Sequence, residues 1–250
     1  MEIRPNKIKH KLLNNEIVTV AMGDFTITAG FIDFIGQYGF DGVWIETEHG
    51  AIDFADIPDM TRAADLWGMT SLVRVNRAEP GIIYRTLDVG AMGIVVPHVN
   101  TANEAEEIAK AAKFYPLGNR GYFSSRQSYG VDDFVHNANQ QSMVVVMIED
   151  VLAVKNLDEI LAVDNIDVYF VAPGDLGQSM GILDMNDPRV TQTVDDVITR
   201  IVSAGKVAGG TGGAARATEY LDMGARFICT NWSSWIDAEA NTFLEAVRKR

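Results

Sequence analysis

Two hydrophobic segments of the chain each end at a carboxylate. MVVVMIE (143–149) ends at Glu149, and VYFVAPGD (168–175) ends at Asp175. Both are continuous apolar runs, as in buried parallel strands, and such a strand has little reason to end in a carboxylate unless something binds it. Two carboxylates suit Mg²⁺ or Mn²⁺, which keep coordination positions for water and substrate oxygens. The pair therefore predicts a divalent-metal site.

Polar side chains follow other predicted strands as well. The strand ends carry Asp24, Glu46, Glu48, His49, Arg74 and His98. Any single acid among them could simply cap the next helix, because acidic residues stabilise helix amino-termini. Taken together they form a dense polar ring in a chain with only 4 histidines, and this ring indicates a catalytic site at the ends of the strands.

The elements that must position this ring are short apolar segments alternating with amphipathic helical patterns. The expected strands are residues 17–23, 42–47, 71–75, 93–99, 143–149, 167–173, 206–210 and 226–231. With the helices between them they predict a single-domain (β/α)8 TIM barrel over residues 1–250, in which catalytic groups gather at the carboxyl ends of the strands. A doubly wound open sheet is the alternative.

Two segments lie outside this repeating pattern. The long polar stretch 118–141 is predicted to be an extended loop, and loops of that length are often functional. The last helix, residues 235–250, carries a stripe of apolar side chains: Trp235, Ile236, Ala240, Phe243, Leu244 and Val247. The stripe could close the chain's own barrel, but we expect it to pack on a neighbouring subunit.

The composition excludes several kinds of partner. A chain of 250 residues that is 47% hydrophobic can bury a full core. Its formal net charge of -13 argues against nucleic acid and anionic membranes as partners.

The single cysteine, Cys229, excludes an internal disulfide and a thiolate metal site. No signal-peptide core or bilayer-spanning apolar stretch is present, so a cytoplasmic location is expected.

The predicted cation site suggests enolate chemistry. A ligand that binds the cation through carboxyl and keto oxygens would complete its coordination, and the cation would polarise the carbonyl and acidify the adjacent C–H. A lysine Schiff base could perform the same chemistry. However, every lysine except Lys206 belongs to an expected helix or the amino-terminal segment, and Lys206 begins its strand at the wrong end of the barrel. The lysine mechanism is therefore disfavoured.

Several motifs resemble the HpcH/HpaI family of metal-dependent (class II) pyruvate aldolases, and they occur in that family's order. They are GFDGVWIETEHG, LVRVN, LDVGAMGIVVPHVNTANEAEEIAKAAKFYPLGNRGY, VVVMIED and FVAPGDLGQSMG. The resemblance extends from about residue 17 to the carboxyl terminus, and the combination is specific although single pieces are not. It implies an oligomeric barrel, either a trimer or a hexamer.

The resemblance also implies roles for the strand-end residues. Glu149 and Asp175 hold Mg²⁺, Mn²⁺ or Co²⁺, and the substrate binds beside Gly174 and Asp175. Arg74 lies near the carbonyl oxygen and stabilises the enolate. The residues themselves require a partner for Arg74, because a buried unpaired guanidinium is costly. A salt bridge to Glu46 or Glu149 would also meet that need.

Acid–base roles follow from the same resemblance. His49 is the acid/base, assisted by Asp88 from a neighbouring subunit, and Arg120 lies near the site mouth. Local reasoning leaves other interpretations open. His49 could be a helix cap, although its titration range suits proton transfer. Asp88 could be a surface acid near a helix carboxyl terminus.

This sequence departs from the family pattern at several positions. Glu46 stands where relatives usually carry Asp, and Met147 replaces the usual Gln two residues before Glu149. Gly174 and Gly177 replace an Ala and a Ser. The glycine-rich segment Gly209–Gly213 could bind phosphate through backbone N–H groups, but a tight turn with close backbone approach is favoured.

The sequence thus predicts a lyase, an aldolase that cleaves a 4-hydroxy-2-oxo acid to pyruvate, or a close 2-oxo acid, and an aldehyde. A malyl- or citramalyl-CoA-type lyase is the nearest alternative, but it needs a basic groove that this acidic chain does not display. A non-catalytic barrel that binds a small acid is a third interpretation, and it leaves the polar ring poorly explained.

Overall fold

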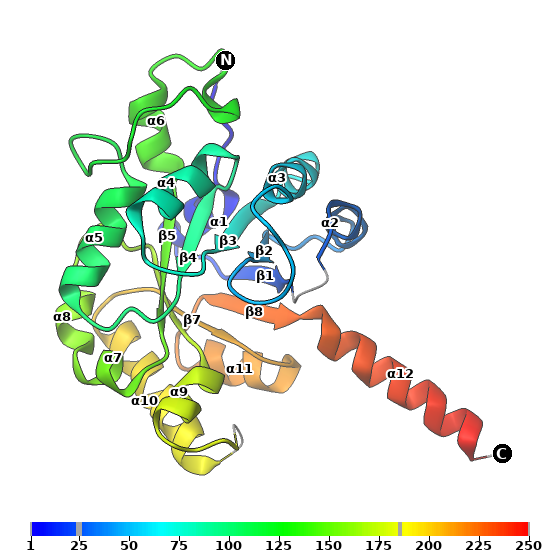
Figure 1. Ribbon diagram of the computed structural model, residues 1–250. Coiled ribbons are helices and arrows are strands. Elements are labelled where there is room, and N and C mark those ends of the chain that lie inside the picture. Colours follow the sequence, from blue (N-terminus) through cyan, green and yellow to red (C-terminus); the bar gives the residue numbers. More distant parts are fainter. Residues whose placement is uncertain (1, 24–26, 185–186, 250) are drawn as a thin grey trace.

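Eight parallel strands close into a barrel in the computed structural model, which describes residues 2–23, 27–184 and 187–249 (Figure 1). The strands are β1 (Val18–Met22), β2 (Gly42–Glu46), β3 (Thr70–Arg74), β4 (Gly93–Val96), β5 (Met143–Ile148), β6 (Val168–Val171), β7 (Ala208–Thr211) and β8 (Phe227–Asn231). Each pairs with the next, and β8 pairs with β1 in parallel. The predicted barrel is confirmed and the open sheet is wrong. Asp24 lies outside the described residues.

Helices surround the barrel between successive strands. They are α1 (Lys7–Leu13), α2 (Ala29–Gly36), α3 (Ile57–Leu66), α4 (Pro80–Asp88), α5 (Ala102–Ala112), α6 (Phe134–Gln141), α7 (Val151–Lys155), α8 (Leu157–Leu161), α9 (Pro173–Ser179), α10 (Pro188–Ser203), α11 (Ala214–Asp222) and α12 (Trp232–Arg248). The prediction of an extended loop over 118–141 is wrong in its second half, where a 3₁₀ turn at Arg126–Ser128 and α6 form. In the described part of the chain, no helix combines the length and apolar character needed to cross a membrane.

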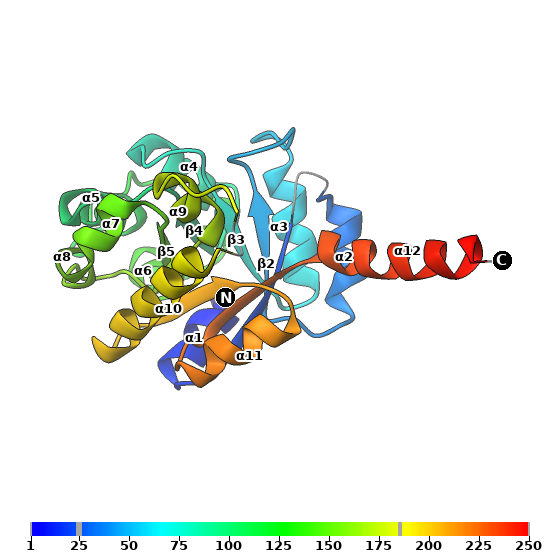
Figure 2. The same ribbon diagram turned by 90° about the horizontal axis from the view of Figure 1, so that it is seen from below.

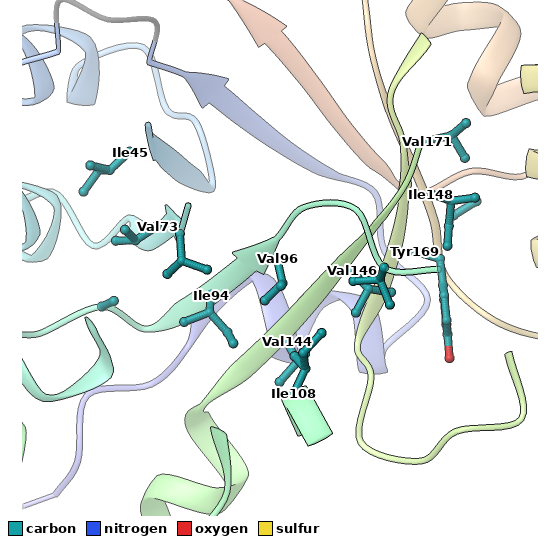
Figure 3. Packing of buried hydrophobic residues seen from close by; sticks show 14 of the residues in the cluster. Ile45, Val73, Ile94, Val96, Ile108, Val144, Val146, Ile148, Tyr169 and Val171 are labelled. Carbon is teal, nitrogen blue, oxygen red and sulfur yellow. The ribbon is translucent and has the colours of Figure 1, made fainter. Parts of the chain in front are cut away.

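Strand alternation divides the buried side chains into two cores. One fills the barrel interior and includes Trp44, Leu72, Phe170 and Phe227. The other lies between the sheet and the helices, where Figure 3 shows Ile108 of α5 next to Val144 of β5. Ile8 and Leu12 of α1 belong to the interior core, so α1 closes the amino-terminal end of the barrel. The carboxyl ends of the strands are left for the polar residues.

The last helix extends away from the barrel in both views (Figures 1 and 2). Among the described residues, its first turn packs against the rest of the chain: Trp232 is buried, and the ring of Trp235 stacks on Phe40 with centroids 5.6 Å apart. Farther along, Phe243 is 64% exposed and Val247 is 56% exposed. The helix therefore does not close its own barrel. Of the two alternatives predicted from the sequence, packing on a neighbouring subunit is the one that stays open.

The glycines of β7 are required by close packing on both faces of the strand. A Cβ atom on Gly209 would lie 2.8 Å from Phe227 Cδ1, and one on Gly210 would lie 2.7 Å from Tyr220 Cε2. A Cβ atom on Gly213 would meet nothing within 4 Å. Close backbone approach accounts for Gly209 and Gly210, as the favoured interpretation of this segment predicted.

We predict that Gly209→Ala lowers the free energy of unfolding by about 1–3 kcal/mol, because the aromatic ring of Phe227 must move to admit the methyl group. Gly121→Ala is the matched control and should change stability little, because this loop glycine also has nothing within 4 Å of an added Cβ atom. Urea denaturation of both variants measures the difference. Equal stability of the two would contradict this account of β7.

Candidate active site

Glu149 follows β5 directly and is buried, with 1% of its surface exposed. Its Oε1 atom accepts a hydrogen bond of 2.7 Å from the backbone N–H of His98. Its Oε2 atom is buried and has no hydrogen-bond partner among the described residues. A buried carboxylate oxygen without a partner is energetically unfavourable, so this atom suits a bound cation.

Asp175 provides a second carboxylate on the neighbouring strand connection. It lies in the first turn of α9, which begins directly after β6, and Gly174 precedes it in the same turn. Because β5 and β6 are neighbouring strands, Asp175 and Glu149 follow adjacent strand ends, and the negative charge of Asp175 acts on the pKa of Glu149. No set of three or more His, Cys, Asp or Glu residues arranged for a metal occurs in the described ranges. Two oxygen donors with open positions fit Mg²⁺, Mn²⁺ or Co²⁺ better than a structural zinc ion.

Burial raises the pKa of Glu149 to about 7, and the negative charge of Asp175 adds to the rise. The His98 N–H and the positive charges of His98 and Arg74 act in the opposite direction without cancelling it. A cation beside the carboxylate would offset the cost of ionising it, since an opposite charge favours the ionised form.

Arg74 ends β3 with its guanidinium held by two carboxylates. Its Nε donates to Glu46 Oε2 at 2.6 Å, and its Nη1 lies 3.1 Å from Glu48 Oε2. All three side chains are largely buried. The predicted pairing of Arg74 with Glu46 is therefore present. It fixes the orientation of the guanidinium, which continues to carry a positive charge.

Glu46 also shapes the turn after β2. Its Oε1 accepts from the backbone N–H groups of Glu48, at 2.8 Å, and His49, at 3.0 Å. One carboxylate thereby positions both the guanidinium of Arg74 and the loop that carries His49. Burial raises the pKa of Glu48, although the positive charges of Arg74 and His49 oppose the rise.

The imidazole of His49 is 67% exposed, and its Nε2 lies 3.8 Å from Glu48 Oε2. No helix begins at His49, since the next one, α3, starts at Ile57 with Asp56 as its amino-terminal cap. The helix-cap interpretation of His49 is therefore wrong. A solvent-accessible imidazole at the mouth is free to exchange protons with a bound ligand.

His98 and Asp150 form a second polar pair at this mouth. His98 Nδ1 lies 3.0 Å from Asp150 Oδ2 and 3.6 Å from Glu149 Oε1. The backbone of His98 is left-handed, with φ of 52°, and this conformation accompanies the N–H bond to Glu149. Burial alone would lower the pKa of His98, but the hydrogen bond that its imidazole donates to Asp150 and the negative charges of Glu149, Asp150 and Glu48 raise it.

Met147 faces the barrel interior one layer below Glu149 and is 2% exposed. Its sulfur lies 3.9 Å from Arg74 Nη1. The side chain that contacts Arg74 from β5 is thus only a weak acceptor. Arg74 consequently depends on Glu46 and Glu48 for its strong contacts.

Asp88 and Arg120 lie at the other end of the barrel. Asp88 is the last residue of α4, shortly before β4 begins, and its Oδ1 accepts from Arg120 Nη2 at 2.7 Å. The Arg120 side chain is 1% exposed. The structure therefore brings neither residue to the mouth of its own barrel. A role for either at a mouth requires a second chain.

Comparison with known proteins identifies the family of this chain. The family described as HpcH/HpaI aldolase/citrate lyase matches residues 27–232. The chain belongs to this family. A hydroxypyruvate/pyruvate aldolase from Roseobacter denitrificans is 37% identical over 204 residues, covering 78% of this chain and 79% of the relative. A 2-keto-3-deoxy-L-rhamnonate aldolase from Salmonella gallinarum is 31% identical over 219 residues, covering 85% of this chain and 82% of the relative.

A solved HpcH/HpaI aldolase/citrate lyase family protein from Burkholderia cenocepacia has the same fold. It superposes with a TM-score of 0.90 at 27% identity, covering 97% of this chain and 99% of the other. Because the curated relatives are named aldolases, this member of the HpcH/HpaI family is a carbon–carbon lyase. The interpretation as a non-catalytic barrel is set aside.

Sequence reasoning left some residues of this HpcH/HpaI mouth without a role. It placed Glu48 and His98 in the polar ring but assigned them no contacts, and it did not select Asp150 at all. Asp150 directly follows Glu149 at the end of a buried strand, which was the available signal. Asn231, the last residue of β8, was also overlooked.

The raised pKa of Glu149 predicts a specific stability profile. The carboxyl ionises near 4.5 in the unfolded chain and near 7 in the metal-free folded protein, so folding takes up a proton between these values. Its contribution to stability is present below 4.5 and is lost as the pH rises to about 7.

Glu149→Gln should therefore melt above the metal-free wild type at pH 8, by roughly 5 °C, with a smaller gap at pH 5. Calorimetry of the chelator-treated proteins measures the gap, and Glu159→Gln, an exposed position on α8, is the control. A gap that does not change with pH would contradict the assignment.

Proposed function

We propose that this enzyme catalyses reversible, divalent-metal-dependent cleavage of a 4-hydroxy-2-oxo acid to pyruvate, or a close 2-oxo acid, and an aldehyde. The observation that carries the proposal is the buried, unpartnered Oε2 of Glu149 beside Asp175, with the guanidinium of Arg74 at the same mouth. Relatives named as pyruvate and 2-keto-3-deoxy-acid aldolases support the same reaction class.

Glu149 and Asp175 would hold Mg²⁺, Mn²⁺ or Co²⁺. A bound cation would act as a Lewis acid on the keto group of the 2-oxo acid. Gly174 and Asp175 lie in the first turn of α9, where backbone N–H groups have no helical carbonyl to bond. We assign these N–H groups to the carboxylate of the 2-oxo acid.

Arg74 would stabilise the charge that develops during cleavage. A base removes the proton of the C4 hydroxyl, the C3–C4 bond breaks, the aldehyde leaves, and the electron pair passes into the enolate of the 2-oxo acid. The guanidinium is already oriented by Glu46 and Glu48, so it needs little rearrangement to stabilise the enolate oxygen. Protonation of the enolate carbon completes the reaction.

His49 is the proposed proton carrier for these steps. Its imidazole is exposed at the mouth, and Glu46 fixes its backbone. Asp88 would assist it only from a neighbouring chain, because within one chain it lies at the opposite end of the barrel with Arg120. The proposal therefore includes a homo-oligomer in which one subunit's amino-terminal rim approaches another's mouth.

The exposed stripe on α12 supports such an assembly. Ile236, Phe243, Leu244 and Val247 face solvent on a helix that leaves its own barrel. An apolar groove of about 400 Å³ lies beside the start of this helix and is lined by Phe31, Phe34, Ile35, Tyr38, Phe40, Trp232, Trp235 and Ile236. We propose that α12 of a second subunit packs on this apolar surface.

Removal of the metal tests the proposed reaction. Treatment with a chelator should abolish pyruvate release from 4-hydroxy-2-oxo acids, and Mn²⁺, Co²⁺ or Mg²⁺ should restore it, because the keto group is then polarised again. Calorimetric titration with Mn²⁺ should show binding to wild type and to the control Glu159→Ala, but not to a protein carrying both Glu149→Ala and Asp175→Ala. Full activity without metal, or a lysine adduct trapped by borohydride, would contradict the proposal.

Charge on the α12 stripe tests the assembly. Wild type should behave as an oligomer in light scattering, whereas combined Phe243→Glu and Val247→Glu substitutions should yield monomers, since the new carboxylates cannot be buried in an apolar interface. Asn241→Glu, on the opposite side of the helix, should leave the oligomer intact. A monomeric wild type would exclude the assembly.

A further inference from the structure

Asn231 carries another buried oxygen without a partner among the described residues of this mouth. It is the last residue of β8, and its Oδ1 atom is buried with no hydrogen-bond partner among the described residues. Such an oxygen is costly unless a ligand or another donor satisfies it. Glu149 Oε2 and Asn100 Oδ1 are buried oxygens of the same kind beyond β5 and β4. The first belongs to the proposed metal site, and the amide of Asn100 is already held through its Nδ2, which donates to the His98 carbonyl and to Asp150 Oδ2.

The usual reason for an asparagine at this position does not apply. Asn231 occupies the cap position before α12, where its side chain would normally accept a hydrogen bond from the first turn of the helix. Here the side chain makes no capping bond. Only its backbone carbonyl is used locally, by the hydroxyl of Ser234 at 2.6 Å.

Strand alternation directs the amide into the barrel mouth. Phe227 and Cys229, two and four residues earlier on β8, belong to the interior core, so Asn231 faces the same way. Thr211 ends the neighbouring strand β7, and it shares the inward face with Gly209, whose added Cβ atom would meet the interior rings of Phe170 and Phe227. A hydroxyl and an amide thus lie on adjacent strand ends.

This polar pair lies on the side of the mouth away from Arg74. Glu149 and Asp175 follow β5 and β6, and Arg74 ends β3, whereas Asn231 and Thr211 end β8 and β7. In the proposed reaction the 2-oxo acid occupies the first side. We place the aldehyde half of the substrate on the second side, at the ends of β7 and β8.

We infer that Asn231, with Thr211 beside it, recognises a hydroxyl group on the aldehyde half of the substrate, so that the enzyme selects hydroxylated over deoxy aldehydes. A hydroxyl can donate to Oδ1 or accept from Nδ2, and it therefore satisfies the amide in either orientation. An apolar aldehyde chain would leave the amide unpaired. This inference rests on the proposed aldol reaction and adds the class of its aldehyde.

Competition between matched aldehydes tests the inference. With pyruvate and Mn²⁺, kcat/KM is measured for glyceraldehyde and for propanal, which has the same number of carbons and no hydroxyl groups. Wild type should prefer glyceraldehyde, because bound propanal leaves the amide of Asn231 without a hydrogen-bond partner. Asn231→Leu has no such amide, so it should reduce the ratio of the two kcat/KM values by about tenfold. The intrinsic reactivities of the two aldehydes cancel when the ratios of variant and wild type are compared.

Asn231→Ser and Thr211→Val provide the graded variants, and Asn103→Leu, on the exposed surface of α5, is the matched control. Serine keeps a hydroxyl and should retain part of the preference, whereas the control should keep all of it. An unchanged ratio in Asn231→Leu and Asn231→Ser would overturn the inference. If wild type with Mn²⁺ fails to exchange the methyl protons of pyruvate with solvent deuterium, the proposed function itself is overturned, and this inference with it.

Discussion

The arrangement of the mouth depends on one carboxylate that the fold buries but only half satisfies. Glu149 is held through Oε1 by the backbone of His98, while Oε2 is left without a partner among the described residues. The barrel imposes this arrangement, because β5 is enclosed on both sides and its first residue beyond the strand must face the interior. The raised pKa of the carboxyl is the electrostatic consequence. A cation shared with Asp175 is the partner that the proposed function supplies.

Near this carboxylate, the charged side chains of the mouth are linked by hydrogen bonds and ion pairs. Glu46 fixes Arg74 and the backbone of His49, and Glu48 lies between Arg74 and His49. The glutamate at position 46 is long enough to reach both the guanidinium of Arg74 and the backbone N–H groups of Glu48 and His49. Met147 contributes bulk and little polarity beneath Arg74. The guanidinium is consequently oriented from the β2 side of the mouth, and the proposed cation and 2-oxo acid would occupy the Glu149 side.

Sequence reasoning succeeded where strand alternation alone decides position. Glu46, Arg74 and Glu149 could be placed at one rim because apolar runs mark buried strands and a barrel brings their carboxyl ends together. It failed where tertiary contacts decide. The segment 118–141 looks polar throughout, yet Phe134 and Ala138 find a small apolar cluster with Phe114 and allow α6 to form. Asp88 was expected near a helix carboxyl terminus and α12 was expected to pack on a neighbouring subunit. Within one chain, the structure accordingly places Asp88 at the end of α4, away from its own mouth, and leaves the apolar side chains of α12 exposed.

The central claim is that Glu149 and Asp175 share a cation that also binds the 2-oxo acid. A crystal structure with Mn²⁺ and pyruvate tests it most directly, because the anomalous signal of manganese locates the cation independently of its ligands. The account predicts a manganese peak bonded to Glu149 Oε2 and an Asp175 oxygen, with the carboxyl and keto oxygens of pyruvate completing its coordination and Arg74 facing the keto oxygen. Pyruvate bound at this mouth without manganese, or manganese bound elsewhere, would contradict it.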